Sequence, residues 1–338
     1  MPNIHDVAQA AGVSAGTVSN VLNRPSYVGP ETRERVLQAI EDLGFYPARR
    51  KRQFRPGRVK TLGVALANLD NPFFVDVALG AEEAGTEHKS GVVFCNSAYD
   101  AIREAQNLDM LIQQRVQGII IAPVDEYSSR LEALADRGVP MVFVDRVAPD
   151  RDYWSVSVDD FRGGQIGCQH LLDLGHRNIA FIGHPEKSTK VLQRLEGARD
   201  VASKAASAVS LEVISVKSWT IESGQEAGLA ISRRQRSARP TGVLCANDMV
   251  ALGVMQQVVR AGLRVPGDLS IVGYDDLEWA AAATIPLTTV RQPRRLLGRM
   301  AVQMLLQLLE NGPAEAPVTN RVVLMPDLVV RESTGSPN

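Results

Sequence analysis

Cysteine is scarce in this 338-residue chain, which contains Cys95, Cys168 and Cys245 alone. Their odd number and wide spacing exclude a disulfide framework and a CxxC metal or redox site, so we expect three small buried hydrophobic side chains. No apolar run approaches the roughly 18 residues of a membrane span, and the first residues lack a basic region followed by an apolar one. We therefore expect a cytoplasmic protein without membrane contact, metal or cofactor.

The motifs of several enzyme classes are also missing. The sequence has no HExxH or P-loop motif, no early GxGxxG after a strand, and five scattered histidines. His176 is expected at a helix C-terminus, where an imidazole suits capping better than catalysis. We therefore predict that the protein is not an enzyme, and an enzyme and an exported solute-binding protein are the less favoured alternatives.

The formal net charge of -1 conceals an uneven distribution along the chain. Residues 1–58 carry nine Arg and Lys against five Asp and Glu, which leaves +4 at the front and -5 over the remainder. A basic head on an acidic body is typical of a module that binds nucleic acid, although a short basic run is also typical of solvated surface. Hydrophobic residues at 45% and charged residues at 22% indicate a globular chain, whose length indicates two or three folding units.

Hydrophobic periodicity divides the chain into three regions. Residues 1–46 have apolar positions at helical spacing, which predicts three short helices, and residues 47–60 form a basic, proline-bounded hinge or linker. In residues 61–338 short β-rich runs alternate with helix-length segments. The runs are 62–66, 91–95, 118–122, 141–144, 179–182, 213–216, 242–246 and 269–274. Continuous apolar strands of this kind predict an α/β fold with two doubly wound parallel sheets and ligands beyond the carboxyl ends of the strands.

Residues 4–23 have the spacing of a helix-turn-helix. Ala8 lets two helices approach, Gly12 takes the tight turn, Ser14 caps the second helix, and Val18 faces the shared core. On this pattern alone an ordinary helical hairpin is the alternative.

Short motifs in a fixed order run along the whole chain. In the head they are Asp6-Val7-Ala8, Gly12-Val13-Ser14, Thr17-Val18-Ser19, Val21-Leu22-Asn23 and Glu31-Thr32-Arg33. Later landmarks are Asn71-Pro72-Phe73, Leu174-Gly175-His176, Asn247-Asp248, Gly273-Tyr274-Asp275-Asp276, Leu287-Thr288-Thr289-Val290 and Val330-Arg331-Glu332-Ser333. This series resembles the LacI/GalR family of bacterial transcriptional repressors. The resemblance implies a DNA-binding helix-turn-helix joined by the hinge to a two-lobed, periplasmic-binding-protein-like sensor, with lobes of 61–159 plus 293–320 and 160–292 plus 321–333.

By this resemblance the second helix of the head enters the major groove of DNA. Its base-facing positions are Ala15, Gly16 and Asn20, of which Asn20 has the amide geometry to read adenine. Ala15 offers a methyl contact and Gly16 only backbone. Contacts to phosphate fall to Ser14, Thr17, Ser19 and Asn23, for which helix capping and solvated surface are the alternatives.

The same resemblance gives the hinge a role on DNA. Phe54 stands where relatives place a leucine that wedges into a central base step of the minor groove, and Arg52 and Arg55 are placed to contact adjacent phosphates. The alternative for Phe54 is packing back onto the sensor.

Polar and aromatic residues fall where predicted strands end. Carboxylates and arginines bind sugar hydroxyls, and aromatic rings cover the apolar face of a sugar. A resemblance of the sensor to periplasmic ribose-binding proteins implies one sugar site, formed by Asn71, Phe73, Phe74, Asp145, Arg146, Arg194, Trp219, Asn247, Asp275 and Gln292. Taken singly, each residue has a structural alternative as a helix cap, an ion-pair partner or a core side chain.

Together these features predict a homodimeric repressor whose heads read the half-sites of a pseudo-palindromic operator at the nucleoid. A small sugar or sugar-containing metabolite, ribose-like by preference, closes the lobes and releases the DNA. A co-repressor such as a purine or a sugar phosphate is the alternative. No leucine heptad follows Ser333, so we expect a dimer rather than a tetramer.

Overall fold

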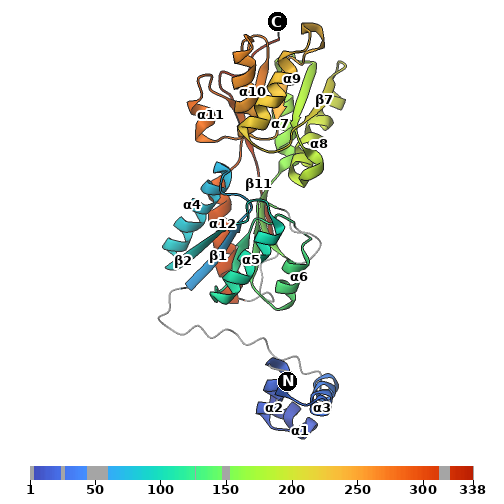
Figure 1. Cartoon of the computed structure of the whole chain (residues 1–338), viewed down its shortest axis with the longest axis vertical. Coiled ribbons are helices and arrows are strands. Elements are labelled where there is room, and N and C mark those ends of the chain that lie inside the picture. Colours follow the sequence, from blue (N-terminus) through green and yellow to red (C-terminus); the bar gives the residue numbers. More distant parts are fainter. Residues whose placement is uncertain are drawn as a thin grey trace. The chain divides into compact units, whose positions relative to one another are not determined.

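The computed structural model describes residues 4–23, 27–43, 60–125, 127–146, 153–311 and 320–337. The chain divides into two compact units, residues 1–58 and residues 59–338 (Figure 1). The domain boundary predicted at residue 46 lies within residues 44–59, which are outside the described ranges, and the boundary predicted at residue 60 adjoins them. Both boundaries stay predictions. Among the described residues, no helix is both long enough and apolar enough to cross a membrane.

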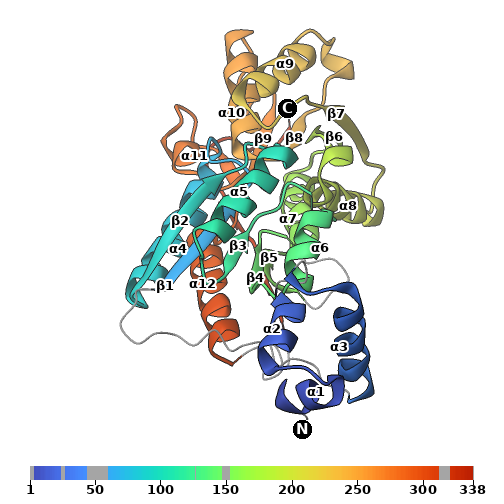
Figure 2. The ribbon, with the colours of Figure 1, turned by 60° about the horizontal axis from the view of Figure 1, so that its bottom comes forward.

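Three short helices make up the described part of the first unit: α1 (Ile4–Ala11), α2 (Ala15–Asn23) and α3 (Pro30–Asp42) (Figure 2). Val7, Val18 and Val36 are fully buried and hold the helices around one small core. Gly12 has a φ of 65°, a conformation that favours glycine, so the chain turns sharply between α1 and α2. The predicted arrangement of helices is confirmed.

The first sheet of the second unit is parallel throughout, in the order β11-β5-β4-β3-β1-β2. Its strands are β1 (Lys60–Leu66), β2 (Ser90–Asn96), β3 (Ile119–Ile121), β4 (Met141–Val144), β5 (Trp154–Val158) and β11 (Arg321–Leu324). Val64 packs toward α4 (Pro72–Glu87) and α12 (Arg294–Asn311), whereas the next residue, Ala65, packs toward α5 (Ala101–Gln113) and α6 (Ser129–Asp136). Burial on both faces explains the continuous apolar runs in the sequence.

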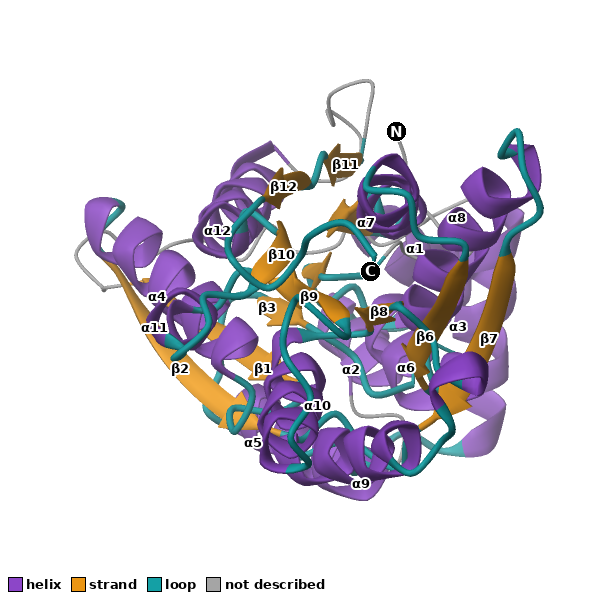
Figure 3. Ribbon diagram, turned by 90° about the horizontal axis from the view of Figure 1, so that it is seen from above, coloured by secondary structure: helices purple, strands orange, loops and turns teal. Residues whose placement is uncertain are grey.

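The second sheet has the order β12-β10-β9-β8-β6-β7 and is parallel except for its edge strand β12 (Figure 3). Its strands are β6 (Asn178–Gly183), β7 (Ser210–Ser215), β8 (Gly242–Cys245), β9 (Ser270–Asp275), β10 (Thr288–Arg291) and β12 (Asp327–Val329). Phe181 packs toward α7 (Asp160–Asp173) and α8 (Thr189–Lys204), and Ile182 toward α9 (Ile221–Ser232) and α10 (Asp248–Arg260). The short helix α11 (Glu278–Ala282) follows β9. All three cysteines are buried and free, as expected.

We call each sheet with its covering helices a lobe, and the described chain crosses between the lobes after β5, after β10 and after β11. The prediction that all of residues 321–333 belong to the second lobe is wrong. β11 pairs with β5 in the first sheet, and only β12 joins the second sheet. Pro326 separates these two short strands, because proline cannot donate a hydrogen bond to a strand ladder.

A glycine brings α7 and α8 into close contact in the second lobe. A Cβ atom at Gly164 would lie 1.9 Å from the carbonyl oxygen of Arg194, so no larger residue fits without moving one backbone. This close approach places Asp160, at the start of α7, next to Arg194 of α8.

Candidate ligand-binding cluster and DNA-contacting surface

Two buried aspartates lie at the carboxyl ends of strands in different lobes. Asp145 directly follows β4, and Asp275 is the last residue of β9. Each is 3% exposed, and each has a positive φ, 62° for Asp145 and 119° for Asp275. Non-glycine residues seldom adopt these backbone angles, and such strained positions concentrate at functional sites.

Lys190, which was not predicted from the sequence, connects the two lobes. Its Nζ donates to Oδ2 of Asp145 and lies 5.4 Å from the ring centre of Phe73 and 6.0 Å from that of Phe74. The two rings pack edge to face, with their centres 5.1 Å apart. The ammonium therefore lies among the carboxylate and the aromatic rings that were predicted to hold a sugar.

Burial acts against the charge on both members of this pair. It raises the pKa of Asp145 and lowers the pKa of Lys190, while the attraction between the two opposes both shifts. Arg146 favours the ionised form of Asp145 and disfavours the charged form of Lys190. These groups belong to one set of interacting charges that we call the inter-lobe cluster: Asp145, Arg146, Asp160, Lys190, Arg194 and Asp275.

Arg194, four residues after Lys190 on α8, makes a second ion pair. Its Nε donates to Oδ1 of Asp160 at 2.7 Å, one Nη donates to the carbonyl oxygen of Ala246 at 2.5 Å, and its Cζ lies 3.6 Å from the ring centre of Tyr274. The Tyr274 hydroxyl donates to the same Asp160 oxygen at 3.1 Å. Although burial alone would lower the pKa of Arg194, Asp160 raises it, so the guanidinium is a fixed positive charge.

Asp275 is held by a side-chain amide rather than by an ion pair. Nε2 of Gln292 donates to Oδ1 of Asp275 at 2.6 Å. Burial raises the pKa of Asp275 to about 6, and Arg194 opposes that rise. Oε1 of Gln292 is buried without a hydrogen-bond partner, an arrangement that costs free energy until a donor such as a ligand hydroxyl reaches it.

Three other predicted ligand residues have structural partners. Oδ1 of Asn71 accepts from the Phe73 amide at 3.0 Å, and Oδ1 of Asn247 accepts from the Val250 amide at 3.0 Å, so both residues cap helices. Nδ2 of Asn247 also donates to the carbonyl oxygen of Trp219 at 3.2 Å, and the Trp219 ring packs against the second-lobe cores. These contacts leave the ligand roles of Asn71, Trp219 and Asn247 as predictions.

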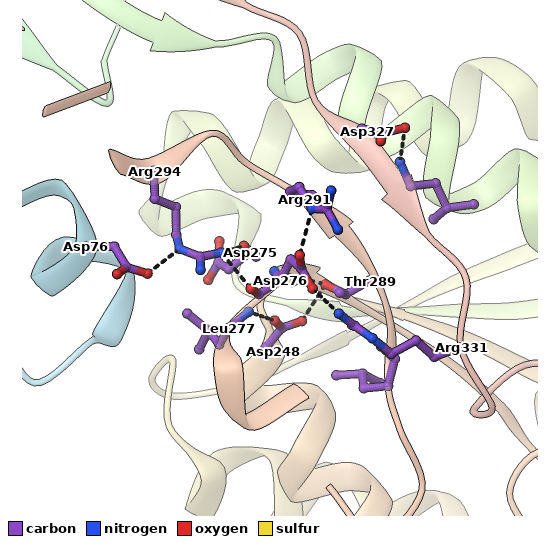
Figure 4. Close-up of polar contacts among 12 residues, drawn as sticks. Asp76, Asp248, Asp275, Asp276, Leu277, Thr289, Arg291, Arg294, Asp327 and Arg331 are labelled. Atoms are coloured by element: carbon purple, nitrogen blue, oxygen red, sulfur yellow. Dashed lines mark hydrogen bonds and ion pairs between the residues drawn. The ribbon is translucent and has the colours of Figure 1, made fainter. Parts of the chain in front are cut away.

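Arg294 ties the backbone at Asp275 to the first lobe (Figure 4). Its Nε donates to Oδ2 of Asp76 on α4 at 2.7 Å, and one Nη donates to the carbonyl oxygens of Asp275 and, at 2.7 Å, Asp276. Arg291 and Arg331 hold the Asp276 carboxylate at 2.7 Å and 2.5 Å. The turn that carries Asp275 is therefore fixed by three arginines.

The fully buried carboxylate of Asp248 also supports the turn that carries Asp275. Oδ2 of Asp248 accepts from the Leu277 amide at 2.8 Å, and Oδ1 accepts from the Thr289 hydroxyl at 2.6 Å. Burial raises the pKa of Asp248, and the nearby Asp275 adds to the rise. Asp248 is thus a structural residue whose two hydrogen bonds join α10 to β10 and to the turn that follows β9.

The residues predicted to contact DNA lie on or just before α2. Gly16 and Asn20 are exposed, whereas Ala15, Thr17 and Ser19 are half-buried. The Ser14 hydroxyl accepts from the Thr17 amide at 3.1 Å, as predicted for a helix cap, and lies 2.9 Å from the Thr17 hydroxyl. The side chain of Asn23 and the hinge residues Arg52, Phe54 and Arg55 lie outside the described residues.

Comparison with known proteins places both units in one family. Residues 3–48 match the model of the bacterial regulatory proteins of the lacI family, and residues 168–334 match that of a periplasmic binding protein-like domain. The ribose operon repressor of Haemophilus influenzae is 34% identical over 336 residues, which cover 98% of each protein. This chain belongs to the LacI family.

Two further matches extend over nearly the whole of this LacI-family protein. The HTH-type transcriptional repressor PurR of Photobacterium profundum is 32% identical over 340 residues, which cover 98% of each protein. The lac repressor dimer bound to operator and the anti-inducer ONPF has a TM-score of 0.72 and 31% identity and covers 99% of each chain. The protein is therefore a transcriptional repressor with a ligand-binding sensor domain and not an enzyme, as predicted.

In this LacI-family repressor, His176 of the motif Leu174-Gly175-His176 has a structural role. His176 is 1% exposed, and its ring nitrogens lie 2.9 Å from the Thr241 hydroxyl and 2.9 Å from the Gly335 carbonyl oxygen. Burial lowers the pKa of the imidazole. The ring therefore fastens the residues near the end of the chain to the second lobe.

Proposed function

We propose that the protein is a homodimeric operator-binding repressor that a small sugar or sugar-containing metabolite releases from DNA, with a ribose-like ligand favoured. The observation that carries this proposal is the placement of Asp145 and Asp275, two buried carboxylates from different lobes, in one set of interacting charges. Buried carboxylates accept hydrogen bonds from vicinal hydroxyls more strongly than neutral groups do. One sugar that binds both residues favours a particular arrangement of the lobes and shifts the population toward it.

The aromatic pair supports a sugar more than an extended or flexible ligand. The Lys190 ammonium lies next to the Asp145 carboxylate and also next to the rings of Phe73 and Phe74, so the carboxylate and the rings are close together. Aromatic rings cover the C–H face of a sugar. The name of the Haemophilus influenzae relative, ribose operon repressor, favours a ribose-like ligand. The name PurR of the other relative favours a purine co-repressor as the second candidate.

On the DNA side, the proposal assigns direct base reading to Ala15, Gly16 and Asn20, and phosphate contacts to Ser14, Thr17, Ser19 and Asn23. Their positions on or next to the second helix of the helix-turn-helix support this assignment. Phe54 is proposed as the minor-groove wedge of the hinge, with Arg52 and Arg55 on adjacent phosphates. Undiminished bending of operator DNA by the Phe54→Ala protein would refute the wedge.

The deciding experiment is a thermal-shift screen of pentoses, hexoses, nucleosides and purine bases, followed by operator release with the compounds that bind. We expect a sugar or nucleoside to raise the melting temperature and to release the operator. Asp275→Ala should retain operator binding and lose the response, because the ligand loses a charged acceptor worth roughly 1.5–3 kcal/mol. Asp327→Ala, at an exposed carboxylate on β12, is the matched control and should respond like the parent.

Two outcomes contradict parts of this proposal separately. If no sugar or nucleoside raises the melting temperature, or Asp275→Ala still responds normally, the ligand site is assigned wrongly. If a purine base binds and strengthens operator binding, the co-repressor candidate replaces the inducing sugar.

A further inference from the structure

Lys190 lies at the centre of the inter-lobe cluster, and we propose that it selects an anionic effector: a sugar that carries a phosphate or a carboxylate. In the bound state Asp145 accepts the ligand's hydroxyls, and Lys190 binds the ligand's anionic group. This inference rests on the proposed sugar-binding function and narrows its ligand class.

The first argument is competition for Asp145. The Lys190 ammonium donates to Asp145 Oδ2 and lies over Phe73, so the lysine uses the same groups that a bound sugar needs. Sugar hydroxyls that donate to Asp145 compete with the Lys190 ammonium for the same carboxylate and weaken that ion pair. The ammonium then needs a new partner, because a buried charge that has lost its counterion is strongly disfavoured.

The second argument is that the remaining carboxylates of the inter-lobe cluster are already engaged. Asp160 accepts from Arg194 at 2.7 Å and from Tyr274 at 3.1 Å, and Asp275 accepts from Gln292 at 2.6 Å. Among the groups facing Lys190, Asp145 and Asp160 stabilise its charge, whereas Arg146 and Arg194 oppose it. Because Arg194 is already paired with Asp160, Lys190 is the cation whose counterion a bound sugar competes for, and an anionic group on the ligand is a partner that suits it.

The third argument is the place of Lys190 on its helix. It is the second residue of α8, whose first turn contains no acidic residue and whose N-cap, Ser188, makes no side-chain capping bond. The positive end of a helix repels a lysine and attracts an anion. A ligand anion beside Lys190 therefore gains from the helix end as well as from the ammonium.

Calorimetric titration of the full-length protein tests this inference with two matched pairs of probes. Ribose 5-phosphate is compared with ribose, and glucuronate with glucose, so that the two pairs separate a phosphate from a carboxylate source. We expect at least one anionic probe to bind about tenfold or more tightly than its neutral partner. We expect Lys190→Gln to remove that preference and Lys190→Arg to keep most of it.

Lys204→Gln is the matched control, because Lys204 lies at the far end of the same helix and is exposed. It should retain the parental preference. Melting temperatures of all variants in the absence of probes identify any loss of folding, and if Lys190→Gln is unstable the paired probes on the parent protein still test the preference for an anion. Retention of the anion preference by Lys190→Gln would show that another group selects the anion.

The outcomes separate this inference from the function on which it rests. If ribose binds as tightly as ribose 5-phosphate and glucose as tightly as glucuronate, the anionic effector is refuted while a sugar effector stands. If none of the four binds and the wider sugar and nucleoside screen is also negative, both proposals fail.

Discussion

The head and the sensor of this repressor present opposite kinds of binding surface. The proposed base-facing positions Ala15 and Gly16 have almost no side chain, and Asn20 is exposed. The proposed effector residues Asp145 and Arg194 are buried, charged and already paired within the protein. We therefore expect a substitution at these positions of the head to change recognition with little effect on folding, and a substitution at these residues of the sensor to change both stability and recognition.

The largest expected effect is at the ion pair between Arg194 and Asp160. Arg194→Ala leaves the buried Asp160 carboxylate without its cation and should lower the free energy of unfolding by about 3–5 kcal/mol and abolish effector binding. Chemical denaturation of the full chain measures the first effect. Arg264→Ala, which removes an exposed ion pair with Asp268, is the control and should melt near the parental temperature. Equal losses in the two variants would remove the distinction between the buried cluster and the surface.

Asp275→Asn should stabilise the sensor at neutral pH even as it weakens effector binding. Because burial raises the pKa of Asp275 to about 6, its ionised form is the disfavoured one, and the parent carries a cost above that pH. A shift of about two pKa units corresponds to a cost of at most about 3 kcal/mol, which shrinks as the pH falls from about 6 and disappears below about 4, where the carboxyl is protonated in both states.

The measurement for Asp275→Asn is the difference in unfolding free energy between variant and parent as a function of pH. That difference should favour the variant at pH 7.5 and fall toward zero at low pH. A difference that grows as the pH falls has the opposite sign and would contradict the raised pKa.

Asn20→Ala should affect recognition alone. Loss of an amide that reads a base should weaken cognate operator binding by roughly 1–3 kcal/mol, with little change on random DNA and little change in melting temperature. Binding titrations of the variant and the parent with operator DNA and with random DNA measure this difference in affinity. Gln38→Ala, at an exposed amide on α3, is the control. If Asn20→Ala loses the same affinity for operator DNA and for random DNA, Asn20 contacts the DNA backbone rather than a base.

The smallest expected effect is at Ser14, where the head resembles the sensor because the side chain supports the fold. Ser14→Ala removes the hydroxyl that accepts from the Thr17 amide and should lower the stability of the head by about 1 kcal/mol. Ser14→Asp should restore the cap and weaken DNA binding, because a carboxylate repels phosphate. Thermal unfolding and operator titration of both variants test this, and unchanged DNA affinity in Ser14→Asp would exclude a phosphate contact at Ser14.

The long buried strands were predictable because burial on both faces leaves an apolar run, as at Met141–Val144. β5 was missed because Ser155 and Ser157 interrupt its apolar residues, although both serines are buried. β11 was placed in the wrong lobe because its neighbours in the sheet lie far away in the sequence. Local pattern identifies a strand but carries no information about its partner.

For the candidate site, the expectation that ligands bind beyond the carboxyl ends of strands selected Asp145 and Asp275. The structure brings both residues into the inter-lobe cluster. Lys190 escaped prediction because a lysine in the first turn of a helix is typical of solvated surface. One signal was available: Lys190 and Arg194 are four residues apart and so share a face of α8. Asp160 lacked any such signal, since its pairing depends on the contact between two helices.

The three crossings between the lobes have a consequence for synthesis on the ribosome. Helix α12 supplies Leu297, Ala301 and Leu305 to the core of the first lobe, and β11 supplies an edge strand to its sheet. Both segments are translated after most of the second lobe, so a nascent chain that ends near residue 290 has an incomplete first lobe. Its core then lacks the covering helix on one face, and the exposed apolar surface needs protection until elongation is nearly finished.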